Sequence, residues 1–498
     1  MDENVQQENI VRLARKRRQQ KQRKKRLIIT AVCVLAVLVA GVLAYVIPFR
    51  LVSPAPDKLQ VYEDIGDGAQ LRVGVMSDTQ LKDDKIIAEN GGVNHNAENL
   101  KKTLELFKAQ KVDMIIHAGD IGDMCTSDAY RTYQDTIEEV FPNEKERPIF
   151  LNIMGNHDLW FNTDWTHAVP KHRLYSICTG DSPWVHYEVN GFHFIGASPD
   201  MTDNTQGYSE KVISWLRQEI ESAEKDIKPG DPIFVITHHN LRDTVYGSDE
   251  WYDTAITDLL SQYENVVSIS GHSHFSILDE RSISQKNLTT FTTQSIAYVE
   301  TERGYFDAFA GGENIHPPYY EDYPMCLIMN VSQEQTVIER WNVAKNREEK
   351  ANMRWTLTYP LEKGTFTYRD DVRRSQAAAP VFPENASLTY APFIESYREE
   401  DNGKTLPGIQ FTAAMHQDFV HSYDVRLTDV ASGKMYTYLY LSDFVYGISD
   451  MAKEVRLALD STLPSARYKV DVYAIDSYGR YSAKPVSGEI QWVRPADS

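Results

Sequence analysis

Short apolar runs alternate with helix-like segments through the middle of the chain. The runs have the length and the Val and Ile content of buried strands. Between them, apolar residues recur at helical spacing, as Leu100, Leu104 and Phe107 do. Strands that alternate with helices predict a layered α/β domain, which we place at residues 71–345. The predicted strands cover 71–76, 112–117, 148–154, 233–237 and 266–270, and the predicted helices cover 96–110, 127–140, 208–224 and 251–263. Ser127 or Asp128 is the expected N-cap of the second helix.

The middle of this domain shows the two-residue period of half-buried strands. Residues 184–197 alternate around Asn190-Gly191, a pair that predicts a tight β-hairpin. Residues 298–323 are aromatic, acidic and rich in Gly and Pro. A long loop of this kind is either an active-site wall or a surface excursion, and the sequence leaves both open. Three further segments predict antiparallel strands, at 288–296, 326–331 and 336–343.

The last part of the chain, residues 379–498, has few helix signals and many short alternating segments. Residues 468–474 alternate cleanly and precede a turn at 476–479. This pattern resembles the penultimate strand of a fibronectin type III domain, including a Tyr placed for a tyrosine corner. We expect an all-β sandwich that acts as a spacer or binding module, joined to the first domain by residues 346–378. Another β-sandwich with the same strand rhythm is the alternative.

Residues 27–49 contain no charged side chain and are mostly Leu, Val, Ile and Ala. A helix of that length spans roughly 35 Å, enough for a hydrocarbon core of about 30 Å. The basic tail at 1–26 precedes this run, so the positive-inside rule predicts a single-pass membrane anchor with a cytoplasmic N-terminus. The rest of the chain, beginning with a linker at 50–70, would then be extracellular. A signal peptide cleaved after Ala44 is the alternative.

Charge and cysteine content narrow the class of protein. The formal net charge is −19, yet residues 1–26 hold ten Lys or Arg against three acidic residues, a balance of +7. The remainder therefore carries −26, which argues against a nucleic-acid-binding surface. Only three of the four cysteines lie outside the predicted span, so no disulfide framework is indicated, although one bridge is possible. Such sparse cysteine suits a bacterial surface protein.

Five polar clusters directly follow apolar, strand-like runs. Ligands of α/β sheets bind beyond the carboxyl ends of the strands. Asp, Asn and His that successive strands bring to one place are the material of a metal site, and five clusters in order predict a dinuclear one. The clusters are Asp78-Thr79-Gln80, Gly119-Asp120-Ile121-Gly122-Asp123, Gly155-Asn156-His157-Asp158, His238-His239 and Gly271-His272-Ser273-His274.

The ordered set resembles the calcineurin-like metallophosphoesterase family. That family has the pattern Asp-X-His, Gly-Asp-X-X-Asp, Gly-Asn-His-Asp/Glu, a later His and Gly-His-X-His. The resemblance implies a layered β-sandwich flanked by helices, and two divalent metal ions of the Mn, Fe, Mg or Zn type bridged by Asp120. The implied ligands are Asp78, Gln80 and His274 for one ion, and Asn156, His238 and His272 for the other.

Two positions of this pattern leave a choice open. His239 could replace His238 as a ligand, because strand phase decides which of the two points inward. We favour His238, since it directly ends the apolar run. Gln80 stands where the family usually has His, although an Asp-X-Gln version resembles a known branch of the family. Its amide oxygen is a harder ligand, which shifts the preference towards Mn, Mg or Ca.

The resemblance also implies the reaction. A metal-bound hydroxide would attack a phosphate ester or pyrophosphate, and His157 would help to bind phosphate and protonate the leaving group. Asp158 or Asp123 could accept the ring proton of His157 and fix its orientation. Met124-Cys125 follows Asp123 where protein serine/threonine phosphatases carry Arg-Gly, which argues against a protein substrate.

The expected function is therefore that of an outward-facing, membrane-anchored phosphoesterase. Its expected partners are a small phosphorylated substrate or a cell-envelope phosphate polymer, with no nucleic acid partner. The alternative is a degenerate phosphoesterase domain that serves as a cell-surface binding or scaffold module. Gln80 is the only direct support for that alternative.

Overall fold

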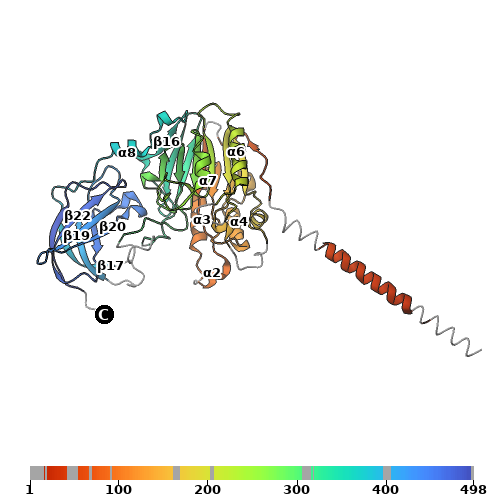
Figure 1. Ribbon diagram of the computed structural model, residues 1–498, viewed down its shortest axis with the longest axis horizontal. Helices are drawn as coiled ribbons and strands as arrows, with labels where there is room; N and C mark the ends of the chain where they lie inside the picture. The colour runs from red at the N-terminus through yellow and green to blue at the C-terminus, as the bar shows by residue number, and fades with distance from the viewer. Residues whose placement is uncertain are drawn as a thin grey trace, which may run out of the picture.

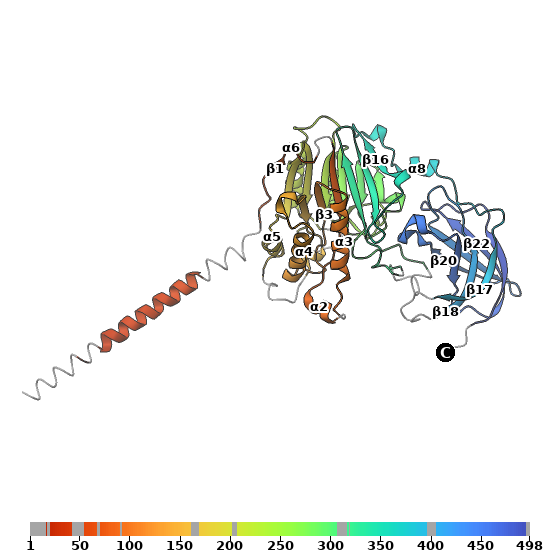
Figure 2. The ribbon, with the colours of Figure 1, turned by 180° about the vertical axis from the view of Figure 1, so that it is seen from behind.

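The computed structural model shows a helix at residues 20–41, a larger domain and a C-terminal domain (Figure 1). In both views the C-terminal domain lies beside the larger domain, next to β16 (Trp355–Thr358) and α8 (Asp370–Gln376) (Figure 2). The helix stands clear of both domains. The structure describes residues 16, 20–41, 54–66, 70–89, 92–160, 169–201, 207–305, 316–317, 319–395 and 405–494.

Two β-sheets form the centre of the larger domain. One contains β1 (Gln60–Tyr62), β5 (Trp184–Val189), β6 (Phe192–Ala197), β7 (Ile233–Thr237), β10 (Val266–Ser270), β12 (Thr289–Thr292) and β11 (Ile283–Gln285), in this spatial order. The other contains β15 (Arg347–Glu349), β14 (Gln335–Asn342), β13 (Met325–Val331), β2 (Leu71–Met76), β3 (Met114–Ala118) and β4 (Ile149–Ile153), with β16 also paired to β14. Their facing sides share one apolar core, in which Val73 and Val75 meet Phe194 and Phe234.

Helices cover the outer face of each sheet. Phe107 and Tyr130 share a second apolar core with Ile115 of β3. Leu216 shares a third core with Ile195 of β6. The domain is therefore layered, with helices outside and two sheets inside. The helices over β3 are α3 (His95–Ala109), α4 (Ser127–Val140) and α5 (Lys171–Thr179); those over β6 are α6 (Glu210–Ala223) and α7 (Thr254–Leu260); the short α2 (Asp84–Glu89) and the pair β8 (Asn240–Leu241) and β9 (Tyr252–Asp253) complete the domain.

Most predicted strands are confirmed, and one prediction of antiparallel pairing holds only in part. β2, β7 and β10 coincide with predicted segments, and β5 and β6 form the predicted hairpin around Asn190-Gly191. The segment 288–296 was expected to pair antiparallel. Its strand β12 does so with β11, but it runs parallel to β10. The chain between β10 and β12 forms the edge strand β11 and then turns back, so that β12 lies between β10 and β11.

The N-cap of α4 also differs from expectation. Ser127 or Asp128 was the predicted cap, but the helix already includes both. Thr126 has extended backbone angles (φ −122°, ψ 149°), and its hydroxyl accepts a hydrogen bond from Ala129 N at 3.2 Å. That combination defines an N-cap, so the cap lies one residue earlier than predicted.

The segment predicted to connect the domains takes part in the larger domain. β15 and β16 both fall within residues 346–378 and pair antiparallel with β14. Only α8 and the chain around it lead on to the C-terminal domain.

The N-terminal region contains the helix at 20–41 and, later, β1. Apolar side chains of the helix are exposed, as Leu27 is at 65%. Of the predicted span at 27–49, residues 42–49 lie outside the described residues. Within the described part of the chain, no helix combines the length and apolarity needed to cross a membrane. β1 lies in the predicted linker and pairs parallel with β5 at one edge of a sheet.

The cysteines do not form a disulfide. Cys125 and Cys326 are buried in the core between the β3 sheet and its helices. Burial raises the pKa of the Cys125 thiol to about 12. These two side chains therefore contribute to packing, as small apolar groups do.

The C-terminal domain is all-β. One sheet contains β17 (Leu388–Glu395), β18 (Thr405–Thr412) and β21 (Glu454–Ala458), and the other contains β20 (Met435–Leu441), β19 (Ser422–Asp429), β22 (Ala466–Ile475) and β23 (Val486–Trp492). Both sheets contribute to one apolar core, with Phe411 from the first and Tyr423 and Trp492 from the second. A sandwich of this kind was expected here.

Candidate metal centre

The strand ends of the two sheets meet at one edge of the larger domain. β2, β3 and β4 run parallel in one sheet, and β6, β7 and β10 run parallel in the other. Their carboxyl ends therefore lie on the same side, and the side chains that follow them are buried. One sheet contributes Asp78, Asp120 and Asn156, and the other contributes His238, His272 and His274.

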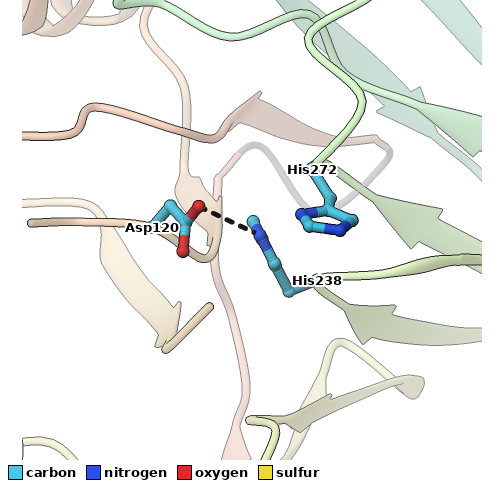
Figure 3. A group of neighbouring side chains, drawn as sticks. All are labelled: Asp120, His238 and His272. Atoms are coloured by element: carbon cyan, nitrogen blue, oxygen red, sulfur yellow. Dashed lines mark ion pairs between the residues drawn. The ribbon is translucent and has the colours of Figure 1, made fainter. Parts of the chain in front are cut away.

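These side chains form two groups that share Asp120. In one group the ligand atoms of Asp120, His238 and His272 lie within 4.8 Å of one another. In the other group those of Asp78, Asp120 and His274 do. Figure 3 shows Asp120 facing His238, with the ring of His272 beside it; Asp120 Oδ2 lies 3.2 Å from His238 Nε2. A carboxylate that belongs to two neighbouring ligand groups can bridge two ions, and Asp120 belongs to both groups.

The donor atoms fit divalent ions. His272 Nε2 is buried and has no hydrogen-bond partner among the residues that the structure describes. Buried polar atoms rarely lack a partner. Burial, reinforced by the nearby rings of His239 and His238, holds the pKa of His272 far below its usual value, so its imidazole is neutral. A neutral imidazole beside ionised carboxylates is the protonation state that metal binding requires.

The carboxylates of the centre are ionised despite their burial. Burial alone would raise the pKa of Asp120, but His238 and His157 outweigh it and lower that pKa. Burial would likewise raise the pKa of Asp78, but the effect of His274 is larger and lowers that pKa. Two buried negative charges so close together favour cations between them.

The backbone leaves no room for side chains at the glycines of the motifs. A Cβ atom on Gly271 would stand 2.5 Å from Asp78 Oδ2. One on Gly119 would stand 2.5 Å from His238 Nδ1, and Gly119 also has a φ of +96°. Glycine at these positions lets the main chain touch the predicted ligands, which fixes their carboxylate and imidazole groups.

Several predicted ligands have left-handed backbone conformations, with positive φ. For a non-glycine residue this conformation costs of order 1–3 kcal/mol and persists only where the surrounding structure holds it. Here backbone hydrogen bonds join the first two clusters, from Asp78 N to Gly119 O at 2.9 Å and from Gln80 N to Asp120 O at 3.0 Å. Such strain is typical of functional sites. The residues concerned are Asp78 (φ 53°), Gln80 (41°), Asp120 (57°), His272 (69°) and His274 (58°).

His238 and His239 point to different places. His238 Nε2 lies 3.0 Å from Asn156 Oδ1, and its Nδ1 lies 2.9 Å from the carbonyl oxygen of Ala118. The carbonyl contact fixes the ring and directs Nε2 into the centre. The ring of His239 instead packs edge-on to Tyr208 and lies outside both groups. Strand phase thus places the favoured residue, His238, among the predicted ligands.

Gln80 reaches the centre from the side of Asp78. Its amide nitrogen is placed 3.5 Å from His274 Nε2 and 3.5 Å from His157 Nε2. The two ends of an amide are assigned from their hydrogen bonds, and a flip would direct the oxygen to the same place. Asn96 Nδ2 donates to Gln80 O at 2.6 Å and holds its backbone. The side chain can therefore approach the ion that Asp78 and His274 would hold.

His157 lies at the open side of the centre, with its side chain 16% exposed. Its Nδ1 lies 3.0 Å from the carbonyl oxygen of Asp123 and 3.6 Å from Asp123 Oδ1. Its Nε2 lies 3.9 Å from Asp120 Oδ2. Asp123 therefore orients the ring, chiefly through its main chain, while the other nitrogen faces the predicted bridging carboxylate.

Asp158 was one of the two residues predicted to orient His157, but it does not do so. Its carboxylate accepts hydrogen bonds from the backbone N–H groups of Ile121 and Gly122 at 3.0 Å and of Gly155 at 2.9 Å. Tyr130 Oη donates to it at 3.1 Å. These four hydrogen bonds use its acceptor capacity, and two of them join the second cluster to the third. Asp158 is therefore a structural residue of the loops that carry the predicted ligands.

Three aromatic rings pack on the histidines of the centre, and only Tyr298 belongs to a segment, 298–323, that the sequence offered as an active-site wall. The Trp160 ring lies 3.7 Å from that of His157, centroid to centroid. Trp251 meets a second histidine edge-on, with its ring 5.2 Å from that of His272. Tyr298 lies 4.3 Å from the ring of His274. Trp160 follows the third cluster directly, but Trp251 and Tyr298 stand in loops whose paths no periodicity predicts.

Known proteins share the pattern of the larger domain. Residues 71–276 match the family model described as calcineurin-like phosphoesterase. This part of the chain is a calcineurin-like phosphoesterase domain. The matched residues include every predicted ligand from Asp78 to His274. We call the larger domain the phosphoesterase domain from here on. No curated protein matches the sequence.

Several solved structures are similar to the chain. A dimetal phosphatase from Danio rerio has 12% identity and a TM-score of 0.37, covering 58% of this chain and 99% of its own. The purple acid phosphatase PPD1 from yellow lupin has 12% identity and a TM-score of 0.38, with coverages of 61% and 55%. A predicted phosphoesterase from Streptococcus pneumoniae has 11% identity and a TM-score of 0.27, with coverages of 58% and 98%.

Proposed function

We propose that this chain is a metal-dependent phosphoesterase that hydrolyses a phosphate ester or a pyrophosphate at a dinuclear centre. The observation that carries the proposal is that Asp120 belongs to both groups of potential ligands. Two divalent ions bound there would activate a water molecule and neutralise charge on the phosphate oxygens. Asp78, Gln80 and His274 would hold one ion, and Asn156, His238 and His272 the other.

His157 would supply the proton for the leaving oxygen. Burial lowers its pKa, but Asp120 and Asp123 outweigh burial and raise that pKa to about 9. The Nδ1 of His157 is engaged by Asp123, which leaves Nε2 to face the substrate beside Asp120. A partly exposed and oriented imidazole is suited to general acid catalysis.

The ligand set suggests which ions to test first. Aspartate, asparagine and glutamine offer hard oxygen donors, and histidine offers nitrogen. Gln80 in place of an imidazole shifts the balance on its side towards Mn or Mg. Mn²⁺ is therefore our first choice, with Fe, Mg and Zn ions as comparisons.

We further propose that the N-terminal helix anchors the protein in the cell membrane, with the phosphoesterase domain outside. The uncharged run at 27–49, the basic tail before it and the exposed apolar side chains of the helix support this. The substrate would then be a small phosphorylated compound or a phosphate polymer of the cell envelope. Protease treatment of intact cells tests the orientation, which is wrong if the phosphoesterase domain survives while a surface control is digested.

The C-terminal domain is, in our proposal, fibronectin type III-like. Its three-stranded and four-stranded sheets share one core, and β19 and β22 are central in the larger sheet. Tyr468 Oη donates to the carbonyl oxygen of Pro464 at 2.8 Å, near the start of β22. A tyrosine bonded to the backbone a few residues upstream is the arrangement of a tyrosine corner.

The test of the enzymatic proposal is hydrolysis of p-nitrophenyl mono- and diesters by the full chain in detergent, with added Mn²⁺. We expect metal-dependent turnover, about two bound ions per chain, and loss of turnover in Asn156→Ala. Absence of turnover would overturn the enzymatic proposal, and fewer than two bound ions per chain in addition would favour a binding or scaffold module.

A further inference from the structure

Residues 298–305 join the metal centre to the C-terminal domain. The segment begins at Tyr298, whose ring is tilted by 60° against that of His274 at 4.3 Å. The Tyr298 side chain also interacts with that of Gln80. Two residues on, Glu300 N donates to the carbonyl oxygen of His274 at 3.1 Å. The start of the segment therefore packs on two predicted ligands of the same ion.

The far end of the segment is held by His421 of the C-terminal domain. Tyr305 Oη lies 3.4 Å from His421 Nδ1, and a carboxylate oxygen of Glu302 lies 3.6 Å from His421 Nε2. Tyr246 Oη lies 3.3 Å from the same Nε2 and also donates to Glu302. The Tyr246 ring packs at 4.7 Å on Phe275, the neighbour of the last predicted ligand. The His421 imidazole thus contacts two segments that lead to the metal centre, one through residues 298–305 and one through Tyr246 and Phe275.

His421 is itself firmly placed. It is 3% exposed and stands at the start of β19. Its N–H donates to Ile475 O at 2.9 Å, and its carbonyl oxygen accepts from Ser442 N at 3.0 Å. Its ring lies 5.1 Å from that of Phe444. The main chain of the C-terminal domain therefore fixes the ring that the segment contacts.

Ionic contacts also dock the C-terminal domain on the phosphoesterase domain. The Lys350 ammonium, 3% exposed, pairs with Asp418. Arg347 pairs with Asp450 at 2.8 Å. These ion pairs fix the C-terminal domain on the phosphoesterase domain. The position of His421 is therefore defined relative to the metal centre.

We propose that His421 is a positioning residue for the metal centre. By fixing Tyr305, it keeps residues 298–305 in place and so keeps Tyr298 against Gln80 and His274. The ion on this side depends most on such support, because a neutral amide replaces an imidazole among its ligands. The C-terminal domain then forms part of the catalytic unit instead of a spacer. This inference rests on the proposed function, since it assigns a role around the same centre.

The test is a Mn²⁺ titration of the full chain in detergent, followed by calorimetry, alongside steady-state kinetics. His421→Ala removes the whole ring, and Tyr305→Phe removes only the hydroxyl that meets it. His416→Ala is the matched control, because His416 lies in the same domain and contacts Ala378 O at 2.8 Å. We expect both variants to weaken one of two Mn²⁺ sites about fivefold or more, in the range of ordinary site coupling. The other site should be unchanged, and kcat should fall more than KM changes.

The outcomes separate the two proposals. If both variants bind Mn²⁺ and turn over substrate as the His416→Ala control does, the positioning role is wrong. A purely structural role would lower the Tm of His421→Ala and leave the Mn²⁺ affinities of folded Tyr305→Phe untouched, which also overturns it. If the wild type binds two Mn²⁺ ions but hydrolyses no ester, the proposed function fails, while weakened Mn²⁺ binding in the variants would still support the positioning role.

Discussion

The main chain of Gly155 lies directly against the carboxylate of Asp120: a Cβ atom on Gly155 would stand 2.1 Å from Asp120 Oδ1 and 2.6 Å from Asp120 N. No side-chain rotation relieves the clash with a backbone atom. Gly155→Ala should therefore shift the predicted bridging carboxylate and lower kcat/KM by about 100-fold or more, as misplacement by about 1 Å can.

The measurement is kcat/KM of the folded variant with p-nitrophenyl substrates and Mn²⁺. Gly364→Ala is the control, because a Cβ atom there meets nothing within 4 Å. Equal activity of the two variants would show that Asp120 need not stay where the structure places it.

Substitution of Asp120 should reduce the number of bound metal ions more than substitution of a ligand that belongs to only one group. Asp120→Asn weakens both groups, whereas His272→Ala removes a donor from only one. We therefore expect elemental analysis to find close to no bound ion in Asp120→Asn and about one per chain in His272→Ala. Retention of two ions by Asp120→Asn would contradict a bridging role.

Asp181 should make stability depend on pH in a direction unusual for a carboxylate. Burial, mainly, raises its pKa from 3.8 to about 6, while Asn152 Nδ2 donates to it at 2.8 Å. The folded state holds the proton more tightly, so the stabilising contribution is complete below pH 3.8 and is lost as the pH rises through 6. Above that, the buried charge opposes folding.

Asp181→Asn removes this charge. We expect the variant to be more stable than the wild type by about 1–3 kcal/mol at pH 7.5, and nearly equal at pH 4. Urea unfolding of both proteins at the two pH values gives the difference. A variant that is less stable at pH 7.5 would show that the ionised carboxylate is favourably bound.

Glu280 balances several buried cations near the junction of the domains. It accepts from Arg340 at 2.6 Å and from Lys350 at 2.5 Å, and Trp355 Nε1 donates to it at 3.1 Å. The Arg340 side chain is fully buried. Removing one partner of a buried ionic group leaves uncompensated charge, so Glu280→Gln should cost about 3–5 kcal/mol.

Scanning calorimetry should show a lower Tm for Glu280→Gln. Glu264→Gln is the control, because Glu264 and Lys363 form a pair in which both side chains are 47% exposed. Such surface pairs contribute about 0–1 kcal/mol. Equal Tm values for the two variants would exclude a stabilising role for the buried cluster.

Local patterns were enough to predict the sheet edge where the predicted ligands gather. The run 233–237 is almost entirely apolar, and 71–76 is interrupted only by Arg72, because most positions on both faces of these strands are buried. Since parallel strands end at the same edge, the residues after them could be placed together without a structure. The choice of His238 followed from the same reasoning, because strand phase is a local property.

Contacts between distant segments could not be predicted in this way. The direction of β12 depends on the path of the chain between strands, which leaves no period in the sequence. The hydrogen bonds of Asp158 to three backbone N–H groups depend on how two loops fold together. The contact between Tyr305 and His421 crosses from one domain to the other, so neither sequence segment indicates its partner.

β1 limits the length of chain between the proposed membrane span and the phosphoesterase domain. Asp57 N donates to Trp184 O at 3.0 Å, and β1 then pairs with β5, so the chain is fixed to the phosphoesterase domain from Asp57 onward. Residues 50–56 alone remain between the predicted span and this attachment, and seven residues reach at most about 25 Å. If the helix spans the bilayer as proposed, the phosphoesterase domain would stay close to the membrane surface. It would then meet phosphate groups fixed in the same envelope at a high effective concentration, whereas freely dissolved ones would gain nothing from the anchor.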